Sequence, residues 1–111
     1  MFSICYVTTP SKVVAEKLAE HLVLGKMAAC VNIIPQVTSV YEWEGKLQKD
    51  EEALMMIKTQ TSLVESVVAA VKKEHPYDVP EVISVPMGEG NNTYLDWVKL
   101  STTKAPTTKS D

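Results

Sequence analysis

The chain has 111 residues, of which 45% are hydrophobic, and a formal net charge of −3. This length suits one domain, and no apolar run approaches the ~18 residues that a membrane-spanning helix needs. All eleven basic residues are lysine, so no side chain offers a planar, two-pronged guanidinium for phosphate, carboxylate or guanine. Composition therefore weighs against nucleic-acid binding, phosphatase activity and membrane insertion.

The start of the chain is strand-like and lacks both a basic segment and a cleavage pattern. We expect a cytoplasmic location, although a longer precursor with a targeting segment is compatible with the sequence. Cys5 and Cys30 form no CxxC motif. Two thiols in a chain with an adequate core do not make a disulfide framework, so both are expected to be reduced.

The first predicted elements are a strand over residues 2–7 and a helix that begins near Val13. Val14, Leu18 and Leu22 recur at helical spacing and predict its buried face. Gly25 is expected to end this helix in the left-handed conformation.

The stretch from Ala29 to Thr59 predicts two long strands joined by a two-residue turn at Glu44-Gly45. Pro35 interrupts the first strand, which marks an edge position or a bulge. The odd positions of this strand are mostly apolar and predict one buried face. They are Val31, Ile33, Val37, Tyr41 and Trp43.

The length of this hairpin is its most informative property. An arm of roughly 13 residues spans ~43 Å, whereas a compact chain of this size has a diameter of about 34 Å. The tip therefore extends beyond its own domain, yet it carries Tyr41 and Trp43, which are costly to leave in water. A second copy of the chain is the simplest cover for them.

The second half of the chain predicts a helix, a short strand and a final helix. Ser62 to Glu65 reads as a capping box before a helix with an apolar face, and a strand over 81–85 and a helix over 93–100 follow. The order β-α-β-β-α-β plus a terminal helix predicts an α+β, ferredoxin-like domain over residues 1–102. Residues 103–111 are polar and expected to form a disordered tail.

Five sequence motifs, in order, carry a resemblance to a known family. They are AACVNIIP (28–35), SVYEWEGK (39–46), IKT (57–59), HPYDVPEV (75–82) and YLDWV (94–98). This set closely resembles the CutA divalent-cation-tolerance family over about residues 2–102. The resemblance implies a tight homotrimer of ferredoxin-like protomers, similar in architecture to PII-type signalling proteins.

The same resemblance implies a non-enzymatic role in tolerance of copper and other divalent metals. Animal members of the family are also linked to the membrane anchoring of acetylcholinesterase, which leaves a protein-scaffolding trimer as an alternative function. A third possibility is a PII-like sensor with a small molecule in clefts between subunits. Fold alone assigns no activity.

Copper, weakly bound, is the cofactor that this resemblance suggests, and Cys30, His75 and Glu81 are the candidate ligands, with Asp78 an alternative oxygen donor. Thiolate and imidazole suit copper. The alternatives are structural: Cys30 is a small residue of a type that is often buried, and His75 is placed to satisfy carbonyl groups at a helix end. Adjacent Met55 and Met56 point to opposite faces of a strand, so core packing is the better interpretation for them.

Polar residues within the motifs give a second candidate set, for a ligand in an inter-subunit cleft. They are Asn32, Lys58, Thr59 and Tyr77, with Glu81 shared. Lys58 is equally compatible with a solvated strand position. Tyr41, Trp43 and Trp97 are flanked by acidic residues rather than basic ones, which favours anchoring at a subunit interface over base stacking.

Overall fold

The computed structural model describes residues 1–104, and residues 105–111 of the predicted tail lie outside the described part. The elements are β1 (Phe2–Thr9), α1 (Lys12–Leu24), β2 (Cys30–Trp43), β3 (Lys46–Gln60), the 3₁₀ turn η1 (Thr61–Leu63), α2 (Val64–Glu74), β4 (Val82–Pro86) and α3 (Asn92–Ser101). The strands form one antiparallel sheet in the order β2-β3-β1-β4. The predicted α+β, ferredoxin-like arrangement with a long hairpin and a short terminal helix is therefore confirmed.

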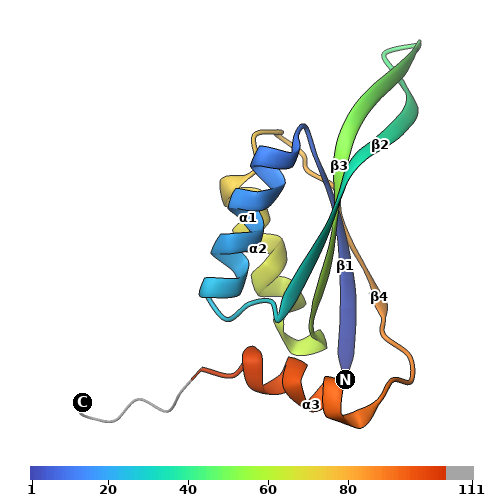
Figure 1. The fold of residues 1–111 in the computed structure, drawn as a ribbon. Helices are drawn as coiled ribbons and strands as arrows, with labels where there is room; N and C mark the ends of the chain where they lie inside the picture. The colour runs from blue at the N-terminus through green and yellow to red at the C-terminus, as the bar shows by residue number, and fades with distance from the viewer. Residues whose placement is uncertain (105–111) are drawn as a thin grey trace.

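Helices α1 and α2 cover one face of this sheet, and α3 lies at the end of the molecule opposite the hairpin tip (Figure 1). Side chains from the covered face of the sheet meet the apolar faces of α1 and α2 in a single core. Fully buried members include Cys5, Met55, Ile57, Leu22 and Val71. Met55 thus packs under the helices, as predicted, and both cysteines are free thiols.

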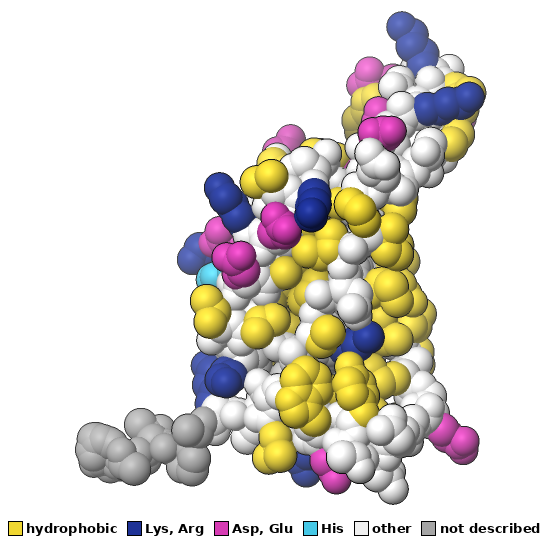
Figure 2. Space-filling view, viewed as in Figure 1, with side chains coloured by type: hydrophobic (Ala, Val, Ile, Leu, Met, Phe, Trp, Pro, Cys, Tyr) yellow, Lys and Arg dark blue, Asp and Glu magenta, His cyan; other side chains and the backbone are white. Residues whose placement is uncertain are grey.

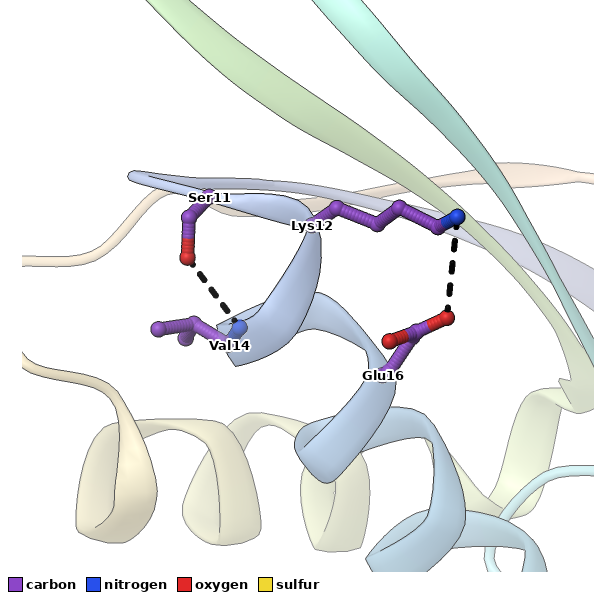
Figure 3. Close-up of polar contacts among 4 residues, drawn as sticks. All are labelled: Ser11, Lys12, Val14 and Glu16. Atoms are coloured by element: carbon purple, nitrogen blue, oxygen red, sulfur yellow. Dashed lines mark hydrogen bonds and ion pairs between the residues drawn. The ribbon is translucent and has the colours of Figure 1, made fainter.

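Helix α1 begins where the sequence suggested but ends differently. Ser11 caps its start, because the Ser11 hydroxyl accepts a hydrogen bond from the Val14 N–H at 3.2 Å (Figure 3). The left-handed Gly25 was a wrong prediction: Gly25 has φ −83°, and Lys26 has φ 62°. Space at position 25 is tight, since a Cβ there would lie 3.1 Å from the His21 carbonyl oxygen.

The predicted capping box at Ser62–Glu65 is also wrong. Helix α2 begins at Val64 after the turn η1, and no side chain caps its first residue. The chain enters the helix by a different route, because the Thr61 N–H donates to the Met1 carbonyl at 2.9 Å and the Thr61 hydroxyl lies 2.8 Å from the Ser3 hydroxyl. These contacts wind the chain into a 3₁₀ turn, which places Ser62 inside the turn rather than before the helix.

The hairpin has the predicted turn, with φ 52° at Glu44 and φ 78° at Gly45. Two positive φ values define the turn type that matches the natural twist of a β-ribbon. The register of β2 against β3 shifts between Ile34 and Val37, so Pro35 lies at a bulge in an edge strand, as predicted.

This bulge overturns the prediction of one buried face along β2. Val31 pairs with Ile57 on the side that faces the helices, but Val37 pairs with Glu52 on the opposite side. An extra residue in one strand exchanges the two faces for everything beyond it. Tyr41 and Trp43 therefore lie on the face of the sheet that α1 and α2 leave uncovered.

The molecule measures 55 × 33 × 20 Å and has a radius of gyration of 15.5 Å, above the ~13 Å of a compact chain of this length. The hairpin causes this elongation (Figure 1). Trp43 is 63% exposed and Leu47 is 69% exposed, so the domain does not cover its own hairpin tip. Within residues 1–104, every helix is too short or too polar to cross a membrane.

Candidate functional site

A cleft of about 840 Å³ begins at the hairpin base, against the loop between α2 and β4, and extends along the uncovered side of the hairpin to Trp43 near the tip. It is lined by Thr8 of β1, by Ser39, Val40, Tyr41 and Trp43 of β2, by Glu52 of β3 and by Tyr77, Asp78, Val79 and Glu81 of the loop. The cleft thus combines aromatic and carboxylate side chains and contains no lysine. Four residues that the sequence assigned to three different roles meet here: Tyr41, Trp43, Tyr77 and Glu81.

Glu52 and Tyr77 join the two walls of this cleft. The Tyr77 hydroxyl donates a hydrogen bond of 2.9 Å to a Glu52 carboxylate oxygen, and Glu52 is only 9% exposed. Burial of the phenol, followed by its hydrogen bond to Glu52, raises the pKa of Tyr77 to about 12. Tyr77 is therefore a neutral donor at physiological pH, and the Glu52 carboxylate is held in place between strand and loop.

A second phenol–carboxylate pair lies higher on the hairpin. The Tyr41 hydroxyl donates to Asp50, which is possible because Ser39 pairs with Asp50 and Tyr41 pairs with the next residue on the same face, Gln48. This hydrogen bond raises the pKa of Tyr41 above its ordinary value. The exposed ring of Tyr41 is thereby fixed along the hairpin.

His75 connects the start of the α2–β4 loop to β1. Pairing of β1 with β4 ends at Val7 and Val82, and the next carbonyl, Thr8 O, lies 2.8 Å from the His75 Nε2 atom. The Tyr77 N–H donates to His75 Nδ1 at 3.1 Å, so Nδ1 accepts and Nε2 carries the proton. His75 is 6% exposed, and it orients the loop that presents Tyr77.

Cys30, Asn32 and Lys58 lie together at the other end of β2. The Cys30 Sγ atom is 3.8 Å from Asn32 Oδ1, and Cys30 pairs with Lys58 across the strands. The Lys58 ammonium lies 5.9 Å from the centre of the Tyr94 ring, and that ring lies 5.6 Å from the ring of Trp97. This second cluster is formed by β2, β3 and α3.

Cys30 and His75, two of the predicted metal ligands, are not neighbours within one protomer. Cys30 pairs with Lys58, which pairs with Ile4 of β1, whereas His75 contacts Thr8 of the same strand. Ile4 and Thr8 are four residues apart, which is about 13 Å along a strand. Residues 1–104 contain no group of three or more histidine, cysteine or acidic side chains arranged to hold a metal ion. The metal assignment to Cys30, His75 and Glu81 stays a prediction.

The predicted cleft residues are divided in the same way. Asn32 and Lys58 belong to the second cluster, Tyr77 lines the cleft at the hairpin base, and Thr59 lies on the covered face of the sheet. The Thr59 hydroxyl is fully buried and donates to the Met27 carbonyl at 2.7 Å. Within one protomer Thr59 therefore fastens β3 to the middle of the α1–β2 loop.

Glu52 is the site residue that the sequence reasoning missed. It follows Glu51 in a run of charged residues, where a solvated position is the ordinary interpretation. The signal that identifies it is Pro35: a bulge at that position pairs Val37 with Glu52 and places both on the uncovered face.

The uncovered face of the sheet is apolar. Figure 2 views the sheet nearly edge-on and shows hydrophobic side chains along the side of the body away from α1 and α2, and charged side chains on the hairpin tip and on α1. Register places Ile4, Tyr6, Leu54, Met56, Ile83 and Val85 on this face. Ile83 is 55% exposed and Val85 is 40% exposed, so this surface continues from the cleft to the second cluster.

The fold and the site define a class of protein: small ferredoxin-like domains with an overlong hairpin, a bare apolar sheet face and an acidic, aromatic cleft. Comparison with known proteins then gives the family. The model of the family described as "CutA1 divalent ion tolerance protein" matches residues 3–101. The chain therefore belongs to this family. The predicted resemblance is thus confirmed.

Relatives and solved structures agree with this assignment. The human protein CutA is 51% identical over 100 residues, which are 90% of this chain and 56% of that protein. The crystal structure of CutA1 from Oryza sativa is 48% identical with a TM-score of 0.90, covering 94% of this chain and 95% of that one. The structure of the divalent cation tolerance protein from Thermus thermophilus is 43% identical with a TM-score of 0.89, covering 93% and 100%.

The chain spans little more than half the length of the human relative, and 64% of the Xenopus laevis homolog. The Arabidopsis thaliana relative, 52% identical over 99 residues, which are 89% of this chain and 54% of that protein, is named chloroplastic, so the cytoplasmic location stays a prediction. The names of the family and of the human relative carry no enzymatic activity.

Proposed function

We propose that the chain acts as a homotrimeric, non-enzymatic protein that binds divalent cations weakly, with copper as the cation to test first. Membership of the divalent ion tolerance family over residues 3–101 carries this proposal. The Thermus thermophilus relative is named a divalent-cation tolerance protein, and this chain covers 99% of its length. No reaction is proposed, because the residues of the cleft offer no nucleophile paired with a base.

The bare sheet face and the hairpin support the trimer. Trp43, Ile83 and Val85 are 63%, 55% and 40% exposed in the single protomer, and they lie on one continuous surface. Large exposed apolar surfaces on small domains mark interaction sites, and closed rings of identical subunits are a common way to cover them. In such a ring Trp43 and Tyr41 contact a neighbour, and Trp97 covers the opposite end of the same face.

Cys30 and Glu81 are the predicted donors that remain accessible in one protomer. His75 is different, because both of its ring nitrogens are hydrogen-bonded, so a metal bound there has to displace the Tyr77 N–H or the Thr8 carbonyl. Copper binding through Cys30 needs further donors from a neighbouring subunit, since thiolate sites for copper use several soft or imidazole ligands.

Native mass spectrometry with and without Cu(II) tests subunit count and bound metal together. We expect a trimer that retains copper, and a clear loss of bound copper in Cys30→Ala/Glu81→Gln. The matched control is Glu16→Gln/Glu20→Gln on α1, which removes exposed carboxylates away from the site. A monomer, or equal copper retention in all three proteins, contradicts the proposal.

The cleft at the hairpin base favours a second candidate function, a PII-like sensor of a small molecule. Its volume of about 840 Å³ lies in the range of small-molecule sites, and Tyr77 and Glu81 of the predicted ligand set line it. The absence of lysine from its walls disfavours a nucleotide. A thermal-shift screen of metabolites tests this candidate, and a screen without any stabilising compound contradicts it.

A further inference from the structure

We propose that Lys58 of one subunit enters the cleft at the hairpin base of the next subunit and pairs there with the Glu52 carboxylate. This inference rests on the proposed trimer and names the charge pair that holds its subunits in register. The site is incomplete in any single protomer, because the cation and the carboxylate come from different copies of the chain. One lysine side chain fills only part of a cleft of about 840 Å³, so the small-molecule candidate is tested separately.

The acidic end of the uncovered sheet face is the first observation. Glu52 is 9% exposed, and within residues 1–104 its side chain accepts one hydrogen bond, from the Tyr77 hydroxyl. Asp78 and Glu81 line the same cleft. Carboxylates that a neighbouring subunit covers without supplying a counter-charge are costly. A neighbour that closes over this end of the face therefore has to bring a cation with it.

The same face carries such a cation at its other end. The sheet contains three lysines, all of them on β3, and register places Lys46 and Lys58 on the uncovered face and Lys49 on the opposite one. Lys46 is exposed beside Trp43 at the hairpin tip, where an ammonium group stays hydrated and gains little from pairing. Lys58 is partly buried, and it is the lysine that a covering subunit would remove from water.

The surroundings of Lys58 leave its charge unpaired. Lys58 pairs with Ile4 of β1, which pairs in turn with Val85 of β4, so apolar residues of the uncovered face lie beside it. Its ammonium lies 5.9 Å from the centre of the Tyr94 ring, and such a contact attracts a cation without neutralising it. The one ion pair that residues 1–104 form lies on α1, so Lys58 has no carboxylate partner among these residues.

The two charges cannot meet within one chain. Glu52 and Lys58 are six residues apart on β3, which is about 20 Å along a strand and beyond the length of a lysine side chain. A ring of identical subunits closes through contacts in which one patch of each subunit meets a different patch of the next. The acidic end and the lysine end of the uncovered face are two such complementary patches. A head-to-tail contact therefore pairs each Glu52 with Lys58 of a neighbouring subunit.

Sedimentation over a range of protein concentrations tests the pair through subunit association. We expect Glu52→Gln and Lys58→Gln each to weaken association at least about tenfold, because each leaves the other charge covered and unpaired. The double variant Glu52→Gln/Lys58→Gln should associate more tightly than either single variant, since it leaves neither charge. The amide oxygen that Glu52→Gln introduces still accepts the Tyr77 hydrogen bond. Losses that simply add in the double variant, or no loss in either single variant, overturn the proposal.

Exchange of the two charges shows whether the pair joins two chains. Glu52→Lys and Lys58→Glu each bring like charges together and should dissociate the trimer, whereas the exchanged chain Glu52→Lys/Lys58→Glu should restore it. A mixture of the two single variants should associate only in part, because three contacts in a ring cannot all match when two kinds of chain are combined. A mixture that stays fully dissociated beside a trimeric exchanged chain would place the pair within one chain and overturn the proposal.

Control variants and a cross-link keep the test decisive if a charge reversal folds poorly. Lys49→Gln, on the opposite face, should leave association unchanged, and a larger loss in Lys46→Gln than in Lys58→Gln would move the contact to the hairpin tip and contradict the proposal. In a Cys30→Ser background, a short bis-maleimide should link Glu52→Cys of one chain to Lys58→Cys of another, since within one chain these positions are about 20 Å apart. Chains that stay unlinked on a denaturing gel contradict the contact.

Subunit count is measured on the same samples by native mass spectrometry, so failure of this inference is distinguishable from failure of the proposed function. A wild-type trimer in which the two single losses add rejects the inference while the trimer stands. A wild-type monomer refutes the trimer and this inference together.

Discussion

The two halves of β3 both pair with β2, one on each side of the bulge. They nevertheless lie in different surroundings. In the half from Ala53 to Gln60, the alternate residues Ala53, Met55, Ile57 and Thr59 are fully buried. In the half from Lys46 to Glu51 no residue is buried. Helices α1 and α2 cover only the half from Ala53 to Gln60 (Figure 1).

One half of the hairpin thus contributes to the core of the domain, and the other half projects from it. The half from Ala53 to Gln60 pairs with β1 and, over Leu54–Lys58, with β2, whereas the half from Lys46 to Glu51 pairs with β2 alone. Burial of apolar area is the dominant favourable term in folding, and it is confined to the half that the helices cover. The other half is a projecting ribbon, and an isolated two-stranded ribbon is at best marginally stable in water. We therefore expect the tip to depend on contacts that one protomer does not supply.

The largest expected effect contrasts two residues of the same strand. Ile57→Ala removes a fully buried side chain and should lower the free energy of unfolding by about 2–5 kcal/mol. Leu47→Ala removes a side chain that is 69% exposed and should change it by no more than about 0.5 kcal/mol in dilute, monomeric protein. Denaturant titration measures both, and an Ile57→Ala cost below that of Leu47→Ala breaks the comparison.

Trp43→Ala tests the dependence of the tip on a neighbouring subunit. If Trp43 anchors the interface, its loss should cost about 2 kcal/mol of association free energy per contact, or about a 30-fold weaker contact. Sedimentation over a range of protein concentrations reports the change. Leu24→Ala is the control, since Leu24 is 82% exposed on α1, and an equal shift in both variants would exclude a special role for the tip.

Gly45 at the hairpin turn gives a smaller effect with a matched control. Its φ of +78° is unfavourable for a residue with a Cβ, although a Cβ there would meet no atom within 4 Å. Gly45→Ala should therefore cost about 1 kcal/mol through backbone strain alone. Gly88→Ala has the same open space without the positive φ and should be neutral or slightly stabilising. Equal midpoints of thermal unfolding for the two variants would contradict this account.

The smallest effect is a pH dependence that belongs to the covered half of the sheet. Burial raises the pKa of the Cys5 thiol above its ordinary value of 9.0. Above about pH 9 the unfolded chain loses this proton while the folded chain keeps it, so stability is full below that pH and falls as pH rises toward the folded pKa.

The slope from this one group is at most about 1.4 kcal/mol per pH unit. The measurement is the unfolding free energy of wild type and Cys5→Ala across the alkaline range. Tyr77, which has a shift of the same sign, is present in both proteins and cancels in the difference. Parallel curves for the two proteins would mean that Cys5 is not shielded.

Periodicity predicted the elements and their order because local patterns decide them. Helical spacing of Leu18 and Leu22, the Glu44-Gly45 turn and the bulge at Pro35 were all evident from the sequence. The two wrong helix ends have different reasons. The end of α1 is local, but the left-handed residue is Lys26 rather than Gly25, and the Met27 N–H donates to the Leu22 carbonyl there. The start of α2 depends on distant residues, because Met1 and Ser3 bind Thr61.

The candidate site was predictable in part. Tyr41, Trp43, Tyr77 and Glu81 were identified as functional candidates, but the sequence distributed them among a metal site, a ligand cleft and an interface. Tyr41 and Tyr77 line the same cleft because the α2–β4 loop runs back along the hairpin. The contact of His75 with Thr8 fixes that loop. Glu52 was missed because a solvated acidic residue and a buried one look alike in a charged run.

By itself the sequence determined the ferredoxin-like order of elements, the family and a hairpin too long for its domain, since all three follow from spacing and length along the chain. The tertiary structure alone decided which face each hairpin residue occupies, that His75 serves the backbone, and that a buried carboxylate stands among aromatic rings. Those outcomes depend on a one-residue bulge and on contacts between distant segments. Neither the register of a strand pair nor the burial of a charge is a property of any local stretch of residues.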